Sequence, residues 1–274
     1  MRIPKDFYIE KFNDKYTTND PVFFDKTQFS WAADLEKNFS EIMQSLAPVF
    51  ESDFEGLIVN PEVSIQFPPK LWKGFSFYFN GIRFNKYLNR FPYISEKLKN
   101  IPHLVSAAIS VLEPGATLLP HNGSTNAVMR VHLPLKVPGS FPKCGMSIEG
   151  HDISWKEGEI IMFCDMKMHY VQNYTSERRY ILLLDVMRPE FVYLKKMVCI
   201  YTIARIITNS FLNVGRYLVG KKVVQKQESA NTNKIKTSSR PLLEKFSAKI
   251  FSIIEKMILY FFVFVFTIYF FFKK

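Results

Sequence analysis

The fold of this chain is decided by five short segments: VSAAISVL (residues 105–112), AVMRVHLPL (127–135), GEIIMF (158–163), HYVQNY (169–174) and RYILLLDVM (179–187). Each run is rich in β-branched or aromatic residues or alternates apolar with polar ones, which is the pattern of a β-strand. Turn sequences separate the runs: EPG at 113–115, VPG at 137–139, EGHD at 149–152 and KEGE at 156–159. Many short strands at this spacing favour an all-β sandwich or barrel over a βαβ fold.

Residues 1–100 have a mixed composition with one clear helical pattern. After Ser30, the apolar residues Leu35, Phe39, Ile42 and Leu46 recur at helical spacing. This periodicity predicts one amphipathic helix that precedes the strands.

The net charge of +11 is distributed unevenly along the chain. Residues 191–274 contain 15 Lys or Arg and three acidic residues, whereas residues 1–190 contain 21 basic and 22 acidic residues. A nucleic-acid enzyme would place its basic residues around the active site, so we expect no nucleic-acid partner. A basic tail beside an apolar segment is instead typical of attraction to anionic lipids.

The C-terminal part divides into three predicted regions: a helical extension at 191–220, a basic polar linker at 221–245 and a membrane anchor at 250–272. The anchor prediction rests on the run MILYFFVFVFTIYFFF at 257–272, which has lysines on both sides. Extension of the run towards residue 250 gives it the length needed to cross a bilayer. Its Phe, Val, Ile and Tyr residues also suit the alternative of a buried β-strand.

The predicted location is a membrane crossed once, with the catalytic domain on the cytoplasmic side. The N-terminus lacks the apolar stretch of a secretory signal, and the three cysteines form no paired motif, which suits a reducing compartment. The basic residues before the apolar run also favour a cytoplasmic position for that side.

Two segments, 112–135 and 169–189, contain three of the five histidines of the chain. Non-haem iron oxygenases bind iron with two histidines and a carboxylate, and leave positions for a keto acid and O₂. In the first segment, strand alternation places Arg130 and His132 on one face, which should line a pocket. In the second, Arg179 inside a barrel would need an anion, and the far carboxylate of a dicarboxylate suits it. Ser110, on an earlier strand, could add a hydroxyl group.

Together these elements resemble the catalytic core of the aspartyl/asparaginyl β-hydroxylase family. The family signature is P-H-x-G-x-T-N, then R-x-H-L, a second histidine, and an arginine ten residues later in a strand that ends D-V-x-x-P-E. Here it is matched by residues 120–126, 130–133, His169, Arg179 and 185–190. The resemblance covers roughly residues 70–190, and five spaced elements in the same order make it specific.

The resemblance implies a mainly β fold, a double-stranded β-helix or jelly-roll barrel, in a domain of residues 1–190 with N-terminal helices. It implies that His121 and His169 bind Fe(II), and that Arg179 with Ser110 holds the distal carboxylate of 2-oxoglutarate. Arg130 and His132 are then expected at the other end of the cosubstrate.

The chain departs from the general iron site at Gly123, where a carboxylate would usually stand. This departure belongs to the family pattern, and it leaves two protein ligands on iron, with water, a halide or another ligand in third place. Asp165, four residues before His169, could hold that water.

The predicted function is hydroxylation of an unactivated carbon with Fe(II), 2-oxoglutarate and O₂. The substrate would be a peptidyl Asp or Asn, or a lipid acyl chain as in the lipid A hydroxylase branch, which a compact membrane-tethered enzyme resembles more. The alternative is a non-catalytic jelly-roll binding module derived from such an enzyme.

Overall fold

The computed structural model describes residues 4, 6–10, 16, 19–51, 54–207 and 257. The chain forms two compact units, Met1–Lys195 and Lys196–Lys274. The first unit ends near the domain boundary predicted at residue 190, and it contains all of the strands in the described part of the chain.

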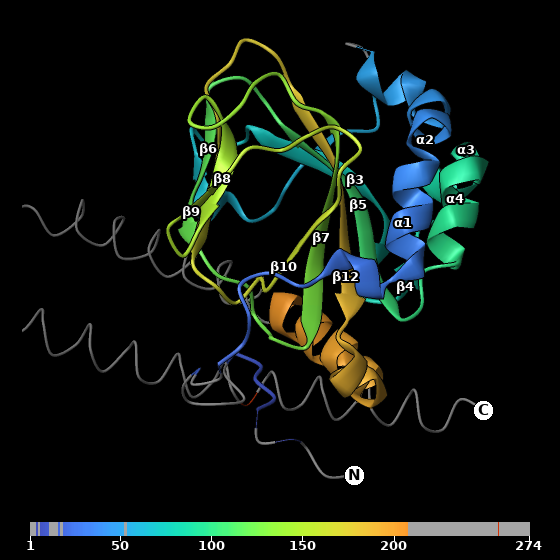
Figure 1. The fold of residues 1–274 in the computed structure, drawn as a ribbon, viewed down its shortest axis with the longest axis vertical. Helices are drawn as coiled ribbons and strands as arrows, with labels where there is room; N and C mark the ends of the chain where they lie inside the picture. Colours follow the sequence, from blue (N-terminus) through green and yellow to red (C-terminus); the bar gives the residue numbers. More distant parts are fainter. Residues whose placement is uncertain are drawn as a thin grey trace, which may run out of the picture. The chain divides into compact units, whose positions relative to one another are not determined.

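Two antiparallel sheets form the body of the first unit (Figure 1). The large sheet contains β1 (Ile58–Val59), β3 (Trp72–Phe79), β4 (Ile82–Arg83), β5 (Leu104–Leu112), β7 (Val128–Lys136), β10 (Ile161–Phe163) and β12 (Arg179–Met187). The small sheet contains β2 (Gln66–Phe67), β6 (Ala116–His121), β8 (Cys144–Ile148), β9 (His151–Ile153) and β11 (His169–Asn173). The strand orders are β1-β3-β5-β12-β7-β10, with β4 beside β3, and β2-β6-β11-β8-β9.

From β5 onward the chain crosses repeatedly between the two sheets. Strands β5, β7, β10 and β12 lie in the large sheet, whereas β6, β8, β9 and β11 lie in the small one. This alternation of antiparallel strands between two facing sheets is a jelly roll. The mainly β jelly-roll fold predicted from the sequence is therefore confirmed.

Helices lie beside the large sheet, on the side of β3 and β5 (Figure 1). They are α1 (Ser30–Lys37), α2 (Phe39–Ser45), α3 (Asn85–Arg90) and α4 (Pro92–Lys99), and the 3₁₀ turns are η1 (Lys26–Gln28), η2 (Ala47–Phe50), η3 (Val63–Ile65) and η4 (Pro189–Leu194). The prediction of one helix after Ser30 was wrong, because the chain breaks between α1 and α2 at Asn38. The Asn38 side chain donates to the carbonyl and the carboxylate of Asp34, and so ends α1.

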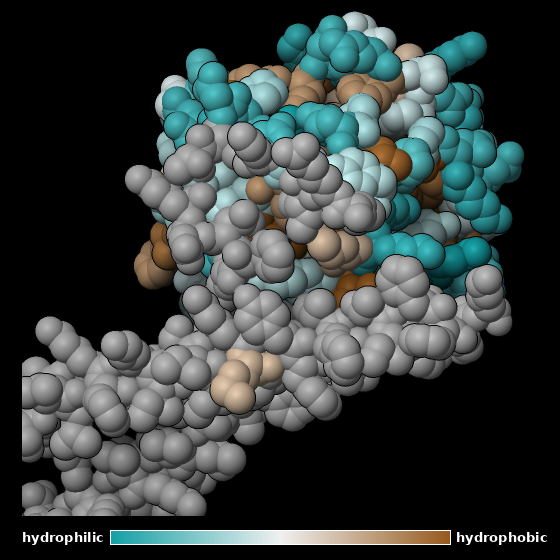
Figure 2. All heavy atoms as spheres, turned by 90° about the horizontal axis from the view of Figure 1, so that it is seen from below, coloured by the Kyte–Doolittle hydropathy of each residue, from teal (hydrophilic) through white to brown (hydrophobic). Residues whose placement is uncertain are grey.

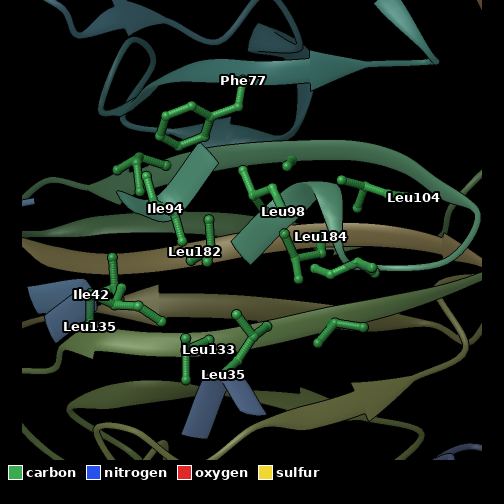
Figure 3. Packing of buried hydrophobic residues seen from close by; sticks show 14 of the residues in the cluster. Leu35, Ile42, Phe77, Ile94, Leu98, Leu104, Leu133, Leu135, Leu182 and Leu184 are labelled. Atoms are coloured by element: carbon green, nitrogen blue, oxygen red, sulfur yellow. The ribbon is translucent and has the colours of Figure 1, made fainter. Parts of the chain in front are cut away.

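The main hydrophobic core lies between these helices and the outer face of the large sheet. Figure 3 shows side chains of this cluster: Leu35, Ile42, Phe77, Ile94, Leu98, Leu104, Leu133, Leu135, Leu182 and Leu184. A second cluster lies inside the barrel and includes Leu112, Met146, Trp155, Phe163 and Ile181. On the face shown in Figure 2, the coloured residues are mostly hydrophilic, with hydrophobic ones in separate patches. The large sheet is therefore covered by helices on one face and encloses the barrel interior with the other.

The N-terminal segment is tied to the loop between β6 and β7 through Asn126, which is fully buried. The Asn126 side chain accepts from the Tyr8 amide at 2.7 Å, and donates to the Asp6 carbonyl at 2.7 Å and the Asp20 carboxylate at 2.9 Å. Asp20 also pairs with Arg188, just beyond β12. These contacts fix the loop that follows His121.

The C-terminal predictions fall mostly outside the described residues. Residues 195–207 are helical, after the 3₁₀ turn η4, so the predicted helical extension begins later than residue 191. The linker at 221–245 lies outside the described residues, and so does the predicted anchor at 250–272 apart from Met257. Within the described part of the chain, no helix has both the length and the apolar character required to cross a membrane.

We predict that Asn126→Ala lowers the free energy of unfolding by about 2–4 kcal/mol, because three hydrogen bonds are lost and the partners of two of them, the Tyr8 amide and the Asp20 carboxylate, stay buried. Urea unfolding followed by circular dichroism measures this change. Asn122→Ala is the matched control, since Asn122 is exposed and bonds only to the adjacent Gly123 carbonyl. The control should change stability by less than about 0.5 kcal/mol. Equal effects of the two substitutions would contradict the anchoring role of Asn126.

Candidate active site

Two histidines from neighbouring strands of the small sheet face each other. His121, at the end of β6, is the cross-strand partner of His169, at the start of β11. Their ring centroids are 4.2 Å apart, and His169 is buried. The antiparallel register therefore brings together two residues that are far apart in the sequence.

Each of these rings is oriented by a backbone carbonyl two residues earlier. His121 Nδ1 lies 2.7 Å from the Leu119 oxygen, and His169 Nδ1 lies 2.8 Å from the Lys167 oxygen. Since a carbonyl can only accept, each Nδ1 donates to its carbonyl, which leaves Nε2 as the atom that a metal ion could bind. Burial also lowers the pKa of His169, which favours its neutral form. Two imidazoles oriented in this way could supply two of the ligands of a divalent metal ion.

A carboxylate stands beside the histidines, and it comes from Asp165. Asp165 Oδ1 lies 3.5 Å from His169 Nε2, and both side chains are buried. A Cβ atom at Gly123 would lie 2.0 Å from Asp165 Oδ2. The Gly123 amide also donates to the Asp165 carbonyl at 2.6 Å. Glycine at position 123 thus leaves the space that the Asp165 carboxylate occupies.

Arg130 is held between two carboxylates. Its Nη1 lies 2.6 Å from Asp165 Oδ1, and its Nε lies 2.9 Å from Asp185 Oδ1. Burial opposes the charge of Arg130, but Asp165 and Asp185 outweigh burial and raise its pKa. The structure therefore places Arg130 where it orients Asp165. The sequence analysis assigned no role to Asp185, although strand alternation puts it on the same face as Arg179.

Arg179 is buried without a counter-ion among the described residues. It is 2% exposed, its Nε has no hydrogen-bond partner, and burial lowers its pKa to about 10. Its guanidinium lies 5.0 Å from the centroid of the Trp155 ring. Ser110 is on the neighbouring strand β5, opposite Ile181, and its hydroxyl accepts from Trp72 Nε1 at 3.0 Å. A buried cation that lacks a partner is suited to bind an anion.

A series of aromatic rings connects Arg179 to the histidine pair. His132 lies 5.9 Å from Trp155 and 5.0 Å from Phe163, and Phe163 lies 5.6 Å from His169, measured between ring centroids. His132 is buried, its Nδ1 has no partner, and burial together with Arg179 and Arg130 lowers its pKa. The neutral His132 thus lies between the cation and the two histidines.

Within the described residues, this region contains three buried side-chain nitrogens without a hydrogen-bond partner: His132 Nδ1, Trp155 Nε1 and Arg179 Nε. Such groups are costly unless a ligand or water satisfies them. These nitrogens could bind a carboxylate-bearing ligand near Arg179, and the two histidines could contribute to a metal site. Among the described residues, however, no group of three or more His, Cys, Asp or Glu side chains is arranged to hold a metal ion. Sequence reasoning did not identify Trp155, which follows β9 in a segment that reads as a turn.

We predict that replacing Arg179 by Met leaves the melting temperature of the ligand-free protein unchanged or raises it by roughly 2–4 °C. The lowered pKa means that the folded state disfavours the charged form, and this penalty is full below pH 10 and decreases above it. Differential scanning fluorimetry at neutral pH measures the shift.

Arg178→Met is the matched control, because Arg178 pairs with Glu113 at 2.9 Å. The control should not stabilise the protein, since it leaves buried Glu113 with Lys73 as its remaining ion-pair partner. A large loss of stability in Arg179→Met would show that Arg179 has a structural partner.

Comparisons with known proteins show which families and proteins this chain is similar to. The sequence model of the aspartyl/asparaginyl beta-hydroxylase family matches residues 33–189. An ornithine lipid ester-linked acyl 2-hydroxylase of Rhizobium tropici is 29% identical over 192 residues, which are 66% of this chain and 66% of that protein. The human aspartyl/asparaginyl beta-hydroxylase is 26% identical over 174 residues, which are 58% of this chain.

The matched part is about two thirds of the Rhizobium protein but 23% of the human one. Among solved structures, a prolyl-4-hydroxylase of Pseudomonas putida aligns with a TM-score of 0.37 and 15% identity. That alignment covers 57% of this chain and 98% of the other.

Proposed function

The chain belongs to the aspartyl/asparaginyl β-hydroxylase family, and we propose that it is an Fe(II)- and 2-oxoglutarate-dependent hydroxylase. The observation that carries the proposal is that one barrel contains two oriented histidines and a buried arginine whose Nε has no hydrogen-bond partner in the described part of the chain. In the reaction, 2-oxoglutarate, O₂ and a C–H group give succinate, CO₂ and a hydroxylated product. The relatives named above are hydroxylases, which supports this class of reaction.

Different residues of the chain would bind the metal ion and the far carboxylate of the cosubstrate, at two ends of the barrel. His121 and His169 would hold Fe(II) through their Nε2 atoms, and the metal would supply the activation of O₂. Arg179 would bind the far carboxylate of 2-oxoglutarate, with Ser110 beside it. His132 lies between the two ends, where it can contact the cosubstrate.

Asp165 and Arg130 would complete the end of the site at which the two histidines hold the metal ion. Asp165 lies close enough to His169 to hold a water molecule at the third ligand position, and Arg130 fixes its carboxylate. Nε, Nη1 and Nη2 of Arg130 each already donate to Asp165 or Asp185, so we infer that its contact with the cosubstrate is made through the second N–H group of Nη1 or Nη2. The apolar interior cluster would keep bulk water away from the reacting carbon.

The surroundings of the histidines favour an apolar substrate, a lipid acyl chain. Leu119, whose carbonyl orients His121, is 40% exposed, and Met168, directly before His169, is 48% exposed. An acyl chain can cover such side chains favourably, whereas an acidic peptide gains little from them. The acyl 2-hydroxylase relative supports this choice, and a peptidyl Asp or Asn is the second candidate. Mass spectrometry of lipid and peptide fractions for products heavier by one oxygen atom distinguishes the two.

The alternative of a non-catalytic binding module predicts that some of the ligand-binding groups have been lost. Both histidines, Asp165 and Arg179 are present and assembled in one place. This favours the enzyme. Anaerobic titration of the protein with Fe(II) and 2-oxoglutarate tests the choice, because a charge-transfer absorption band appears only when both bind at one site.

We predict that His121→Ala and His169→Ala each reduce 2-oxoglutarate turnover by more than about 100-fold, since each removes a metal ligand. Succinate formation and the charge-transfer band are the two measurements. The control is His151→Ala, because His151 is exposed on β9 and its ring contact is with Phe23. Turnover near the wild-type rate in either ligand variant would refute the assignment.

We further propose that residues 250–272 anchor the protein in a membrane, with the barrel on the cytoplasmic side. The support is the sequence: the uncharged run at 257–272, with basic residues before it. Truncation after Arg240 is predicted to move the protein from the membrane pellet to the supernatant and to preserve 2-oxoglutarate turnover. Release of the full-length protein by a carbonate wash alone would contradict membrane insertion.

A further inference from the structure

Trp155 is an aromatic residue whose ring lies against the guanidinium of Arg179, a cation without a counter-ion among the described residues. It follows β9, is 4% exposed, and packs inside the barrel in the cluster that contains Leu112, Phe163 and Ile181. A phenylalanine could supply the same apolar packing. The feature that distinguishes tryptophan is its indole N–H group, a donor that a buried site normally satisfies.

The indole N–H of Trp155 has no hydrogen-bond partner among the described residues, although it is buried. The indole of Trp72, by contrast, donates to Ser110 at 3.0 Å. Buried donors without partners are rare in folded proteins and mark places where a ligand or water is bound. Within the described residues, the indole N–H of Trp155 is therefore available to bind a ligand, whereas that of Trp72 is already used.

Two neighbours of Trp155 also have a buried nitrogen without a hydrogen-bond partner among the described residues. Arg179 lies 5.0 Å from its ring and has an unpartnered Nε, and His132 lies 5.9 Å away and has an unpartnered Nδ1. Arg179 lacks a counter-ion among the described residues, and burial lowers its pKa to about 10. A carboxylate has two oxygens and about four lone-pair sites, so it can accept from a guanidinium and an indole at once.

We propose that Trp155 is a further cosubstrate-binding residue, whose indole N–H donates to the same carboxylate of 2-oxoglutarate that Arg179 binds. The inference rests on the proposed function and adds Trp155 to Arg179 and Ser110 at the far carboxylate. The ring face packs against the guanidinium and the N–H is left for the ligand, so Trp155 holds both the cation and its anion. A 2-oxo acid that lacks the far carboxylate cannot use this donor.

The first test is Trp155→Phe, which keeps an aromatic ring and removes the N–H. The KM for 2-oxoglutarate and its Kd in anaerobic Fe(II) titrations should both increase about 10-fold, because a hydrogen bond to a charged group is lost. Fe(II) affinity without 2-oxoglutarate should stay unchanged. The matched control is Trp31→Phe, a buried tryptophan of α1 outside the barrel interior, which should leave both constants unchanged.

The second test uses the wild-type protein and does not depend on the folding of the Trp155 variant. The chain has three tryptophans, so an ¹⁵N-labelled sample gives three indole signals. Spectra of Trp31→Phe and Trp72→Phe identify two of them, and the third belongs to Trp155. With Zn(II) in place of iron, 2-oxoglutarate should shift the Trp155 signal downfield, and pyruvate, which lacks the far carboxylate, should not.

The outcomes separate this inference from the proposed function. If the wild-type protein does not bind 2-oxoglutarate, the proposed function fails. If it binds 2-oxoglutarate with the same affinity in Trp155→Phe, or if the Trp155 signal does not move, the function stands and the role of Trp155 is overturned. A shift of equal size with pyruvate would place the donor at another part of the cosubstrate and also overturn the proposal.

Discussion

The pairing of β12 with β5 on one side and β7 on the other organises both the core and the site. In this register Ile181 lies opposite Ser110, Leu183 opposite His132, and Asp185 opposite Arg130. Alternate residues of β12, such as Leu182 and Leu184, face the helices and form the main core. The intervening residues, Arg179 and Asp185 among them, face the interior. A shift of one residue would exchange the two sets, so the hydrophobic core also fixes the polar arrangement of the site.

The two interior arginines of the large sheet are used in opposite ways. Arg130 is neutralised by Asp165 and Asp185, and these ion pairs hold the three side chains in place next to the histidines. Arg179 has no such partner in the described part of the chain, and burial destabilises its charge. An arginine that two carboxylates already neutralise attracts a further anion less strongly, whereas the burial cost of an unpaired arginine is offset only when an anionic ligand binds. The contrast explains why two residues with the same side chain are assigned different roles.

The sequence was sufficient for the parts that depend on local pattern. Short β-branched or alternating runs predicted the strands that became β5, β7, β10, β11 and β12, and so an all-β sandwich or barrel, because such runs are visible in a single segment. The jelly roll itself was predicted from the family resemblance. Helices α3 and α4 were not predicted, because each is too short for its apolar residues to show a helical period. Pro92, at the start of α4, also interrupts the pattern between them. The break at Asn38 depends on a side-chain bond to Asp34 that periodicity does not reveal.

In the candidate site, too, some residues could be predicted from the sequence and others could not. The two histidines, Asp165, Arg130, His132 and Arg179 were identified from motif spacing, and the structure brings them into one interior. Asp185 and Trp155 were not among the predicted site residues, because what places them in the site is a contact with a residue far away in the sequence: Asp185 with Arg130, and Trp155 with Arg179. Strand alternation would have placed Asp185 inside, but nothing local marks Trp155, which stands between β9 and a turn. Such residues are found by asking which buried donors lack an acceptor.

The anchoring of the N-terminal segment extends the functional unit beyond the part that resembles the family. The family match begins at residue 33, yet Tyr8 and Asp20 bond to Asn126, three residues beyond Gly123. Gly123 in turn touches Asp165 through its amide and through the space that it leaves open. The position of the Asp165 carboxylate therefore depends on a loop that is held from outside the part matched by the family model. A pattern of motifs specifies the groups that act, whereas the segments that hold these groups in place can lie anywhere in the chain that the fold brings near.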